Sequence, residues 1–398
     1  MERREVVIVG GGPAGAALAI GLARRGRDVL VLERAPAWRW RACGVFTSPV
    51  TIRALATLGL TAAEISSVAR SLPAMRVETP AGTRFRLTYG DDGSLRDAAV
   101  GLDRSALDPL LLKHARDARA EVREGATARE VDIGVGRIGL ADGTSIEGRM
   151  VVGADGIRSI VARAAGVDRP ALLPPRTGLT FHVAEAGPDT PRDARMIVFD
   201  GGYVGLAPIS GGRVNVGIVV GGRSWAERLR VGGAAAVVAE VLAGIPTAAD
   251  DPVDWRVAVR CDPIEGAAPI GHRVTRRQGE RWLLIGDAAG FLDPFTGEGL
   301  HRALRSAALA TDAVDAHLAG DTAALGAYDR AMARRFRSKD AVSLLVQAFL
   351  GQPALFERAA RSLADRPSVR ETMGLVMGDL VPASRALDPR FVVSLLRP

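Results

Sequence analysis

Three glycines near the start of the chain, Gly10, Gly12 and Gly15, have the G-x-G-x-x-G spacing that accommodates a dinucleotide pyrophosphate. The first permits a tight turn, the second leaves room for phosphate beside the backbone, and the third lets a helix pack closely on a strand. Pro13 and Ala14 lie where that helix would begin, so its free N–H groups and positive dipole end would face the phosphates. The pattern predicts a dinucleotide-binding site.

An acidic residue, Glu33, follows Gly15 by 18 positions and precedes Arg34. A carboxylate at this distance can accept hydrogen bonds from ribose hydroxyls. It also disfavours a 2′-phosphate, which argues against NADP at this site. The fingerprint alone does not distinguish FAD from NAD.

The elements that would position these residues form a βαβ unit. Residues 6–9 form a short β-branched run, residues 13–25 are apolar and alanine-rich, and residues 29–33 form a second apolar strand ending in Glu33. These patterns predict a buried strand, a helix and a second buried strand.

Several further residues could carry chemistry, but the sequence assigns no catalytic acid or base. Arg41 is either a phosphate contact or a solvated arginine, and Cys43 is either a contact of a cofactor ring or a small buried filler. His182 on a predicted strand and His301 near a predicted helix start could face a pocket or be structural.

The remaining patterns predict an α/β protein: a Rossmann-type nucleotide-binding domain, an inserted antiparallel β-sheet substrate domain and a helical C-terminal region. Period-two alternation after residue 170 predicts strands, including one from Trp255 to Arg260. The predicted nucleotide-binding domain comprises residues 1–74, 101–169 and 261–320. The substrate domain comprises 75–100 and 170–260, and the helical region 321–398.

Composition narrows the classes of partner. The 398 residues carry a formal charge of +7, but the basic residues are nearly all arginines spread among 45 acids, so no nucleic-acid partner is expected. Cys43 and Cys261 are the only cysteines and lie far apart, which argues against a disulfide or a metal site. With a strand predicted by residue 6 there is no room for a signal peptide, so we expect a cytoplasmic protein. The amphipathic, arginine-rich stretch 331–350 suits an ordinary packed helix better than a membrane surface.

Four separated motifs resemble those of the para-hydroxybenzoate-hydroxylase-like FAD-dependent oxidoreductases, over roughly residues 1 to 340. This superfamily includes single-component aromatic monooxygenases, geranylgeranyl reductases and flavin-dependent halogenases. The motifs are the glycine fingerprint with Glu33, the run Asp103-Arg104-x-x-Leu107-Asp108, the run Gly153-Ala154-Asp155-Gly156, and the segment from Gly286-Asp287 through Pro294 to Gly297-Glu298-Gly299.

The resemblance implies that FAD is the cofactor and assigns roles to individual residues. Arg104 would reach the pyrophosphate, Asp155 would lie near the FAD, and Asp287 would bind the ribityl chain. The backbone at Ala128 would meet the adenine. The helix start at Gly299 and Leu300, after Pro294 and Gly297, would face the flavin ring, where its free N–H groups stabilise negative charge on reduced flavin. Because only one fingerprint is present, NAD(P)H would visit transiently as reductant.

Three flavin chemistries compete. The preferred one is a monooxygenase that hydroxylates an aromatic or polyketide-like natural-product intermediate through a C4a-hydroperoxyflavin, with NAD(P)H as reductant. The alternative is a C=C reductase, because Cys43-Gly44 and the run from Phe291 to Gly299 resemble geranylgeranyl reductases, although Val45 departs from their Cys-Gly-Gly pattern. A halogenase is disfavoured, because the Trp-x-Trp-x-Ile-Pro motif is missing. A non-enzymatic electron-transfer flavoprotein is a fourth alternative. The expected substrate is a small apolar or aromatic molecule, and the oligomeric state is open.

Overall fold

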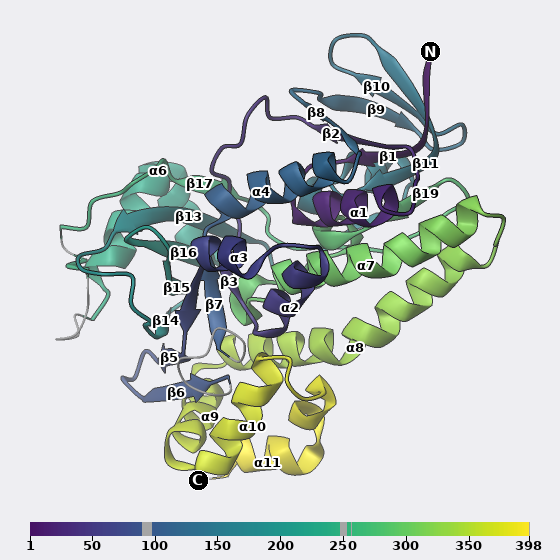
Figure 1. The fold of residues 1–398 in the computed structure, drawn as a ribbon. Helices are drawn as coiled ribbons and strands as arrows, with labels where there is room; N and C mark the ends of the chain where they lie inside the picture. The colour runs from purple at the N-terminus through teal and green to yellow at the C-terminus, as the bar shows by residue number, and fades with distance from the viewer. Residues whose placement is uncertain (90–97, 247–252, 256, 398) are drawn as a thin grey trace.

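The structure, a computed structural model, describes residues 1–89, 98–246, 253–255 and 257–397. The N-terminal sheet and its helices lie at the upper right of Figure 1, a second sheet lies at the left, and the C-terminal helices lie below both. Each of these three regions contains chain segments that are far apart in the sequence, so the regions are not consecutive along the chain.

The first sheet has the strand order β8-β2-β1-β11-β10-β9, with β19 also paired to β11. Strands β8, β2, β1, β11 and β19 run parallel, and β10 and β9 form an antiparallel extension. The bounds are β1 Glu2–Val9, β2 Val29–Glu33, β8 Glu121–Glu124, β9 Ala128–Asp132, β10 Arg137–Leu140, β11 Ser145–Gly153 and β19 Trp282–Leu284. The predicted βαβ unit is present, with helix α1 (Pro13–Ala23) between β1 and β2.

One face of this sheet is covered by α1, α4 (Arg104–Asp117) and α7 (Gly299–Leu318). Helix α1 is apolar on all sides because it is buried between the sheet and the other two helices. The other face carries α5 (Ile160–Ala164) and the strand pair β9–β10. The carboxyl ends of the parallel strands are where ligands bind in sheets of this type.

The second sheet has the order β17-β13-β16-β15-β14-β5-β6 and is antiparallel except for the parallel pair β14–β5. Its strands are β5 Ala74–Glu78, β6 Arg84–Thr88, β13 Arg176–Ala184, β14 Ala194–Phe199, β15 Gly202–Ile209, β16 Arg213–Gly221 and β17 Glu265–Ala267. Period-two alternation sends Phe181 and Val183 toward α6 (Arg223–Ala243), while Thr180 and His182 lie on the opposite face. That opposite face belongs to a second apolar cluster shared with the C-terminal helices.

The strand predicted from Trp255 to Arg260 is wrong. Residue 256 lies outside the described part of the chain, and the neighbouring segment makes only an isolated bridge between Arg260 and Val183. Val257 and Val259 are 72% and 69% exposed, so the two valines that made the segment resemble a strand cover no apolar surface.

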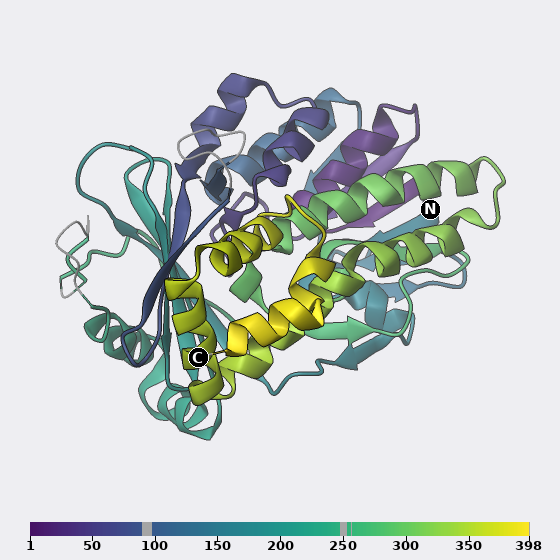
Figure 2. The same cartoon turned by 90° about the horizontal axis from the view of Figure 1, so that it is seen from below.

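The C-terminal helices are α8 Ala324–Leu350, α9 Pro353–Asp365, α10 Pro367–Met377 and α11 Pro389–Leu396. Seen from below in Figure 2, the last three lie at the junction between the second sheet and the α7–α8 pair. Smaller elements join the parts. These are the sheet β3-β7-β4 (Phe46–Thr47, Ala99–Leu102 and Ala69–Leu72), the pair β12–β18 (Asp168–Pro170 and His272–Val274), and helices α2 (Val50–Thr57) and α3 (Ala62–Val68).

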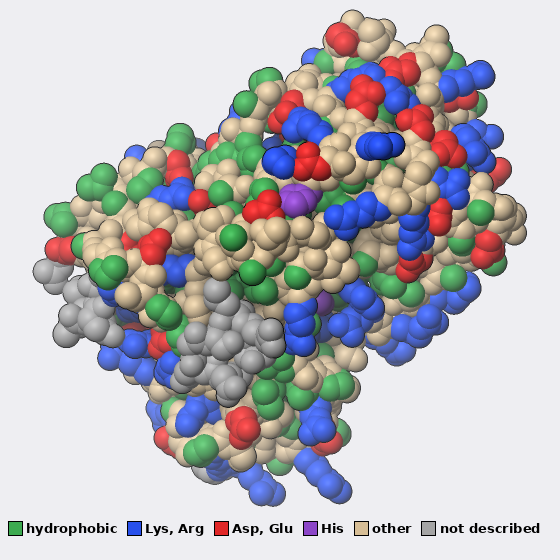
Figure 3. All heavy atoms as spheres, in the orientation of Figure 1, with side chains coloured by type: hydrophobic (Ala, Val, Ile, Leu, Met, Phe, Trp, Pro, Cys, Tyr) green, Lys and Arg blue, Asp and Glu red, His purple; other side chains and the backbone are tan. Residues whose placement is uncertain are grey.

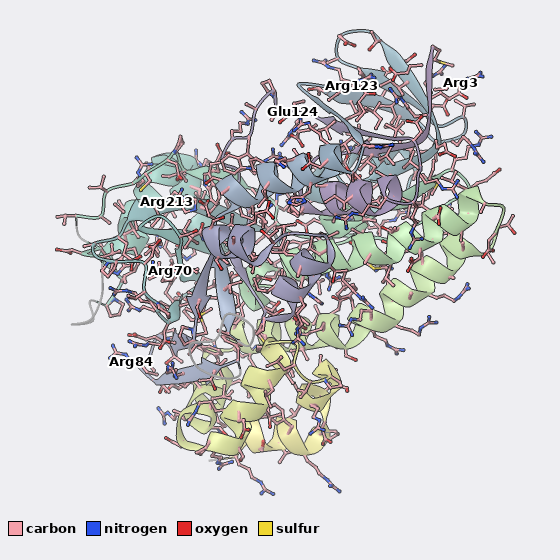
Figure 4. All side chains as sticks on the ribbon, in the orientation of Figure 1. Arg3, Arg70, Arg84, Arg123, Glu124 and Arg213 are labelled. Carbon is pink, nitrogen blue, oxygen red and sulfur yellow. The ribbon has the colours of Figure 1, made fainter. Side chains whose placement is uncertain are left out.

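Charged side chains are mixed rather than segregated over the first sheet. In Figure 3, basic and acidic side chains alternate at the upper right, where Arg123 bonds Glu2 at 2.6 Å and 2.7 Å (Figure 4). Among the described helices, none combines the length and apolarity needed to cross a bilayer.

Candidate active site

The glycine turn between β1 and α1 has the geometry of a phosphate cradle. Gly10 has a φ of +109°, and a β-carbon there would lie 2.4 Å from Ala154 O. A β-carbon at Gly15 would lie 2.0 Å from Gly10 O, so helix and strand are in close contact there. A β-carbon at Gly12 would meet nothing within 4 Å, beside the N-terminus of α1 at Pro13. The turn is therefore closed toward the protein and open where a pyrophosphate would approach.

The end of β2 is organised around the buried carboxylate of Glu33. It accepts from Gly11 N at 2.9 Å and from Ala35 N at 3.0 Å, and Arg41 donates to it at 3.2 Å. Glu33 therefore stabilises the glycine turn itself, a role that the sequence did not indicate. Arg34 is exposed. Glu33 O also accepts from Ala126 N at 2.9 Å, which places the start of β9 at Ala128 at the same end of the sheet.

Arg104, at the first turn of α4, is buried beside Cys43. It donates to Asp108 from two nitrogens, at 2.6 Å and 2.9 Å, and to Gly44 O at 3.2 Å. Burial opposes its charge, but the Asp108 carboxylate raises the pKa of Arg104, so the guanidinium stays protonated. Burial also raises the pKa of the Cys43 thiol to about 11. Cys43 is therefore a neutral thiol at neutral pH.

Two acids from the predicted motifs lie at the ends of strands β11 and β19. Asp155 Oδ2 accepts from Ile160 N at 2.7 Å, whereas Oδ1 is buried and has no partner among the described residues. Asp287 is half-buried, and loss of water around its carboxyl raises its pKa against the opposing charges of Arg104 and Arg302. Asp155 packs against Gly10 of the same turn, and its orphaned carboxylate oxygen fits a polar group that is not part of the protein, as FAD would be.

The start of α7 has the predicted form. Residues Pro294–Thr296 make one 3-10 turn, Gly297 adopts a left-handed φ of +67°, and α7 begins at Gly299 with Leu300 buried. The backbone N–H groups of the first helical turn lack intrahelical acceptors and carry partial positive charge. This end of α7 can therefore stabilise negative charge on a bound ring.

Sequence reasoning missed Asp293, which joins the loop before α7 to the second sheet. Its carboxylate accepts from Tyr203 Oη at 2.6 Å, from Phe295 N at 2.9 Å and from Arg176 at 3.3 Å. Burial raises the pKa of Asp293, while the Tyr203 and Arg176 hydrogen bonds oppose that rise. The sequence shows Asp293 within the run Phe291-Leu292-Asp293-Pro294, but it does not show that Arg176 of β13 and Tyr203 of β15 bind its carboxylate.

A second missed group is a buried triad around Lys339 of α8. Its ammonium contacts Glu298 at 2.7 Å and Asp379 at 2.8 Å, and it donates to Val376 O at 2.8 Å. Glu298 precedes the first residue of α7, so the triad ties that helix start to the C-terminal helices. The sequence feature that could have drawn attention to Lys339 is composition, because Lys339 and Lys113 are the only lysines of the chain.

The two candidate histidines are buried in different places. His182 Nδ1 lies 2.6 Å from Asp262 Oδ2, and its ring centroid lies 4.2 Å from that of Trp40. His301 is buried in the first turn of α7. Burial lowers the pKa of both imidazoles, so both are neutral at neutral pH. The structure does not bring the two histidines into one cluster, and neither acquires a catalytic assignment from its contacts.

The two parts of the molecule also meet at the start of α4. Asp103 caps that helix through Ser105 N at 2.9 Å and is paired with Arg213 of β16. Nearby, Arg70 of β4 is buried and paired with Glu185. Figure 4 shows Arg213 and Arg70 at this junction. These ion pairs fix the second sheet against the nucleotide-binding part.

Comparison with known proteins agrees with this geometry. The family model described as "FAD binding domain" matches residues 3–342. Digeranylgeranylglycerophospholipid reductase 1 of Methanopyrus kandleri is 32% identical over 80% of this chain and 83% of its own length. The menaquinone reductase of Mycobacterium tuberculosis is 30% identical over 79% of this chain and 77% of its own.

Among solved structures, a flavoprotein/dehydrogenase from Cytophaga hutchinsonii has a TM-score of 0.82 at 16% identity, covering 98% of this chain and 97% of its own. The flavin-dependent halogenase CmlS has a TM-score of 0.73 at 25% identity, covering 94% of this chain and 68% of its own. The first likeness concerns the fold alone. The chain belongs to the FAD binding domain family and is an FAD-dependent oxidoreductase of the para-hydroxybenzoate-hydroxylase-like superfamily.

Proposed function

We propose that this protein is a reductase that adds two hydrogens to a C=C bond of a small apolar substrate. The observation that carries the proposal is that relatives 30–32% identical over about four fifths of this chain are named reductases. The C=C reductase was the alternative in the sequence analysis, where the monooxygenase was preferred. The monooxygenase prediction stays open as the second candidate.

The apolar surroundings support the choice of substrate class. One face of the second sheet, the loop carrying Trp40, and the C-terminal helices share an apolar cluster that includes Tyr203, Phe349, Phe356 and Leu395. Bound FAD in its reduced form would supply the hydride. The protein's own part is to bind FAD through the Gly12 turn, to stabilise charge at the start of α7, and to keep water from the substrate.

Val45 favours the monooxygenase as a second candidate. It replaces the second glycine of the reductase pattern and is buried in the same apolar cluster. A side chain here changes the surface next to Cys43, where the reductase pattern leaves space. NAD(P)H is the proposed reductant in both cases.

The two chemistries separate by product and by oxygen requirement. The FAD-loaded protein, reduced without oxygen, is mixed with menaquinone or a geranylgeranyl lipid, and products are weighed by mass spectrometry. A product that has gained two hydrogens without oxygen supports the reductase. A product that appears only when oxygen is admitted and has gained one oxygen atom supports the monooxygenase instead. Oxidation of the flavin with neither product would favour electron transfer.

A further inference from the structure

The centre of the second sheet has an open floor on the face that carries the apolar cluster. Gly205 of β15 and Gly217 of β16 are directly paired in the antiparallel register. Thr180 of β13 lies beside Gly217, and Met196 of β14 lies beside Gly205. We call the paired Gly205 and Gly217 the glycine floor (strands β13 to β16 in Figure 1).

Nothing from the covering layer approaches the glycine floor. A β-carbon at Gly205 would have its nearest neighbour at Met196 Cε, 3.6 Å away, and one at Gly217 would have Asn215 Nδ2 at 3.8 Å. Both neighbours belong to the same sheet. By contrast, a β-carbon at Gly202 of β15 would lie 2.4 Å from Val219 O. Glycine inside a strand often marks close approach of a ligand. Here a side chain at either position would make ordinary contacts within the sheet and would not clash.

An unsatisfied hydrogen-bond donor faces this space. Asn215 is 6% exposed, and its Oδ1 accepts from Thr180 Oγ1 at 3.1 Å. Its Nδ2, the atom next to the Gly217 position, finds no acceptor within the described part of the chain. A donor that finds no acceptor within the protein is usually matched by a water molecule or a ligand.

Two other polar groups of this face have partners of their own. Tyr203 Oη is bonded to Asp293, and His182 Nδ1 lies against the carboxylate of Asp262. His182 Nε2 is buried and has no partner among the described residues, but with the proton on Nδ1 it is an acceptor. Asn215 Nδ2, the atom nearest to the Gly217 position, is therefore the donor that a ligand on the floor would meet. Around it the face is apolar, with Met196 and Val219 among its side chains.

We infer that the substrate is a flat, uncharged ring compound that lies on the glycine floor and places a carbonyl oxygen against Asn215 Nδ2. This inference rests on the proposed function and narrows its substrate class. A C=C bond conjugated to that carbonyl accepts hydride more readily when an N–H group donates to the oxygen. Asn215 is thus assigned to carbonyl recognition, and Gly205 and Gly217 to accommodating the ring.

The test measures binding to the oxidised FAD-loaded protein, without turnover. The probes are menadione, a flat ring with carbonyl oxygens, and 2-methylnaphthalene, a similar ring without them. Binding is followed by equilibrium dialysis and by the change in the visible flavin spectrum. We expect menadione to bind about fivefold to tenfold more tightly, as one hydrogen bond would give.

Two variants and a control locate the site, with a fourth variant in reserve. Asn215→Asp keeps an acceptor for Thr180 but removes the donor, so the preference for menadione should disappear. Gly205→Val fills the floor and should weaken both probes at least tenfold. The control Gly139→Val changes a strand glycine of the distant β9–β10 pair and should alter neither affinity. If Asn215→Asp does not fold, Gly217→Ala, whose β-carbon meets nothing closer than 3.8 Å, replaces it and should also weaken both probes.

Equal affinity of the native protein for the two probes would overturn the inference, as would the absence of binding by either. A preference for menadione that survives Asn215→Asp, or binding unaffected by Gly205→Val, would place the ligand elsewhere and also overturn it. Because no product is measured, these outcomes are independent of whether the protein proves to be a reductase.

Discussion

Lys339→Met tests whether the buried triad holds the start of α7 in place. The substitution keeps the length of the side chain but removes its charge, leaving Glu298 and Asp379 without their cation. The side chains of the three residues are 9%, 10% and 7% exposed in the order Lys339, Glu298, Asp379, so water cannot replace the ammonium. Breaking a buried ion pair by removing one partner typically costs about 3–5 kcal/mol.

The other lysine of the chain provides a matched control. Lys113 pairs with Asp117 at 2.6 Å on α4, but the two side chains are 64% and 56% exposed. Exposed pairs contribute little to stability, because water and salt screen both charges. Lys113→Met should therefore lower the free energy of unfolding by much less than Lys339→Met does.

The assay is urea unfolding of the FAD-loaded protein at one fixed FAD concentration, because bound ligand stabilises the folded state. Flavin release is measured in parallel, since Glu298 lies in the loop before α7. The cost of Lys339→Met should shrink as the pH falls from 8 toward 5. Burial already raises the pKa of Glu298, loss of Lys339 raises it further, and protonation removes the uncompensated charge. A Lys339→Met cost no larger than that of Lys113→Met, or one that grows at low pH, would refute this reasoning.

Three further predictions concern the cofactor site and the buried titratable groups. Gly12→Val should fold with unchanged stability, because a β-carbon at this position meets nothing within 4 Å. Its affinity for FAD, measured by equilibrium dialysis, should fall at least tenfold. Retained affinity would contradict the assignment of this turn as the phosphate-binding site. In the native protein at pH 8, iodoacetamide should label exposed Cys261 and leave Cys43 unmodified, because burial raises the pKa of the Cys43 thiol to about 11. Peptide mass spectrometry identifies the labelled cysteine. Labelling of Cys43 before unfolding would contradict this prediction. Burial lowers the pKa of His182. Below about pH 6.5 the unfolded chain therefore binds a proton at this residue that the folded chain does not bind, and the free energy of unfolding decreases as the pH decreases. His182→Gln should reduce the slope of unfolding free energy between pH 7 and 5, and an unchanged slope would count against a neutral His182.

Part of the site was predictable because its interactions are local. The turn from β1 into α1 depends on Gly10 and Gly15, whose close contacts lie within one strand-turn-helix unit or at the adjacent β11 end. The start of α7 at Gly299 likewise follows from the glycine and proline pattern just before it. Such patterns specify backbone geometry over a few residues, which is why they are visible in sequence.

Other parts depended on strand register and helix packing. Tyr203 and Asp293 are separated by 90 positions, and their hydrogen bond exists only because β15 faces the loop before α7. The segment after Trp255 alternates like a strand, but Val257 and Val259 remain exposed, so its local pattern was misleading.

The Rossmann-type unit, the position of the cofactor turn and the superfamily follow from local sequence patterns, because glycine spacing and short apolar runs act within a few residues. Long-range packing instead establishes that Glu33 holds the glycine turn, that Lys339 ties Glu298 to Asp379, and that Asn215 lies beside the glycine floor. Each of these depends on which distant side chains share one buried space, and in that space an unpaired charge or donor is costly.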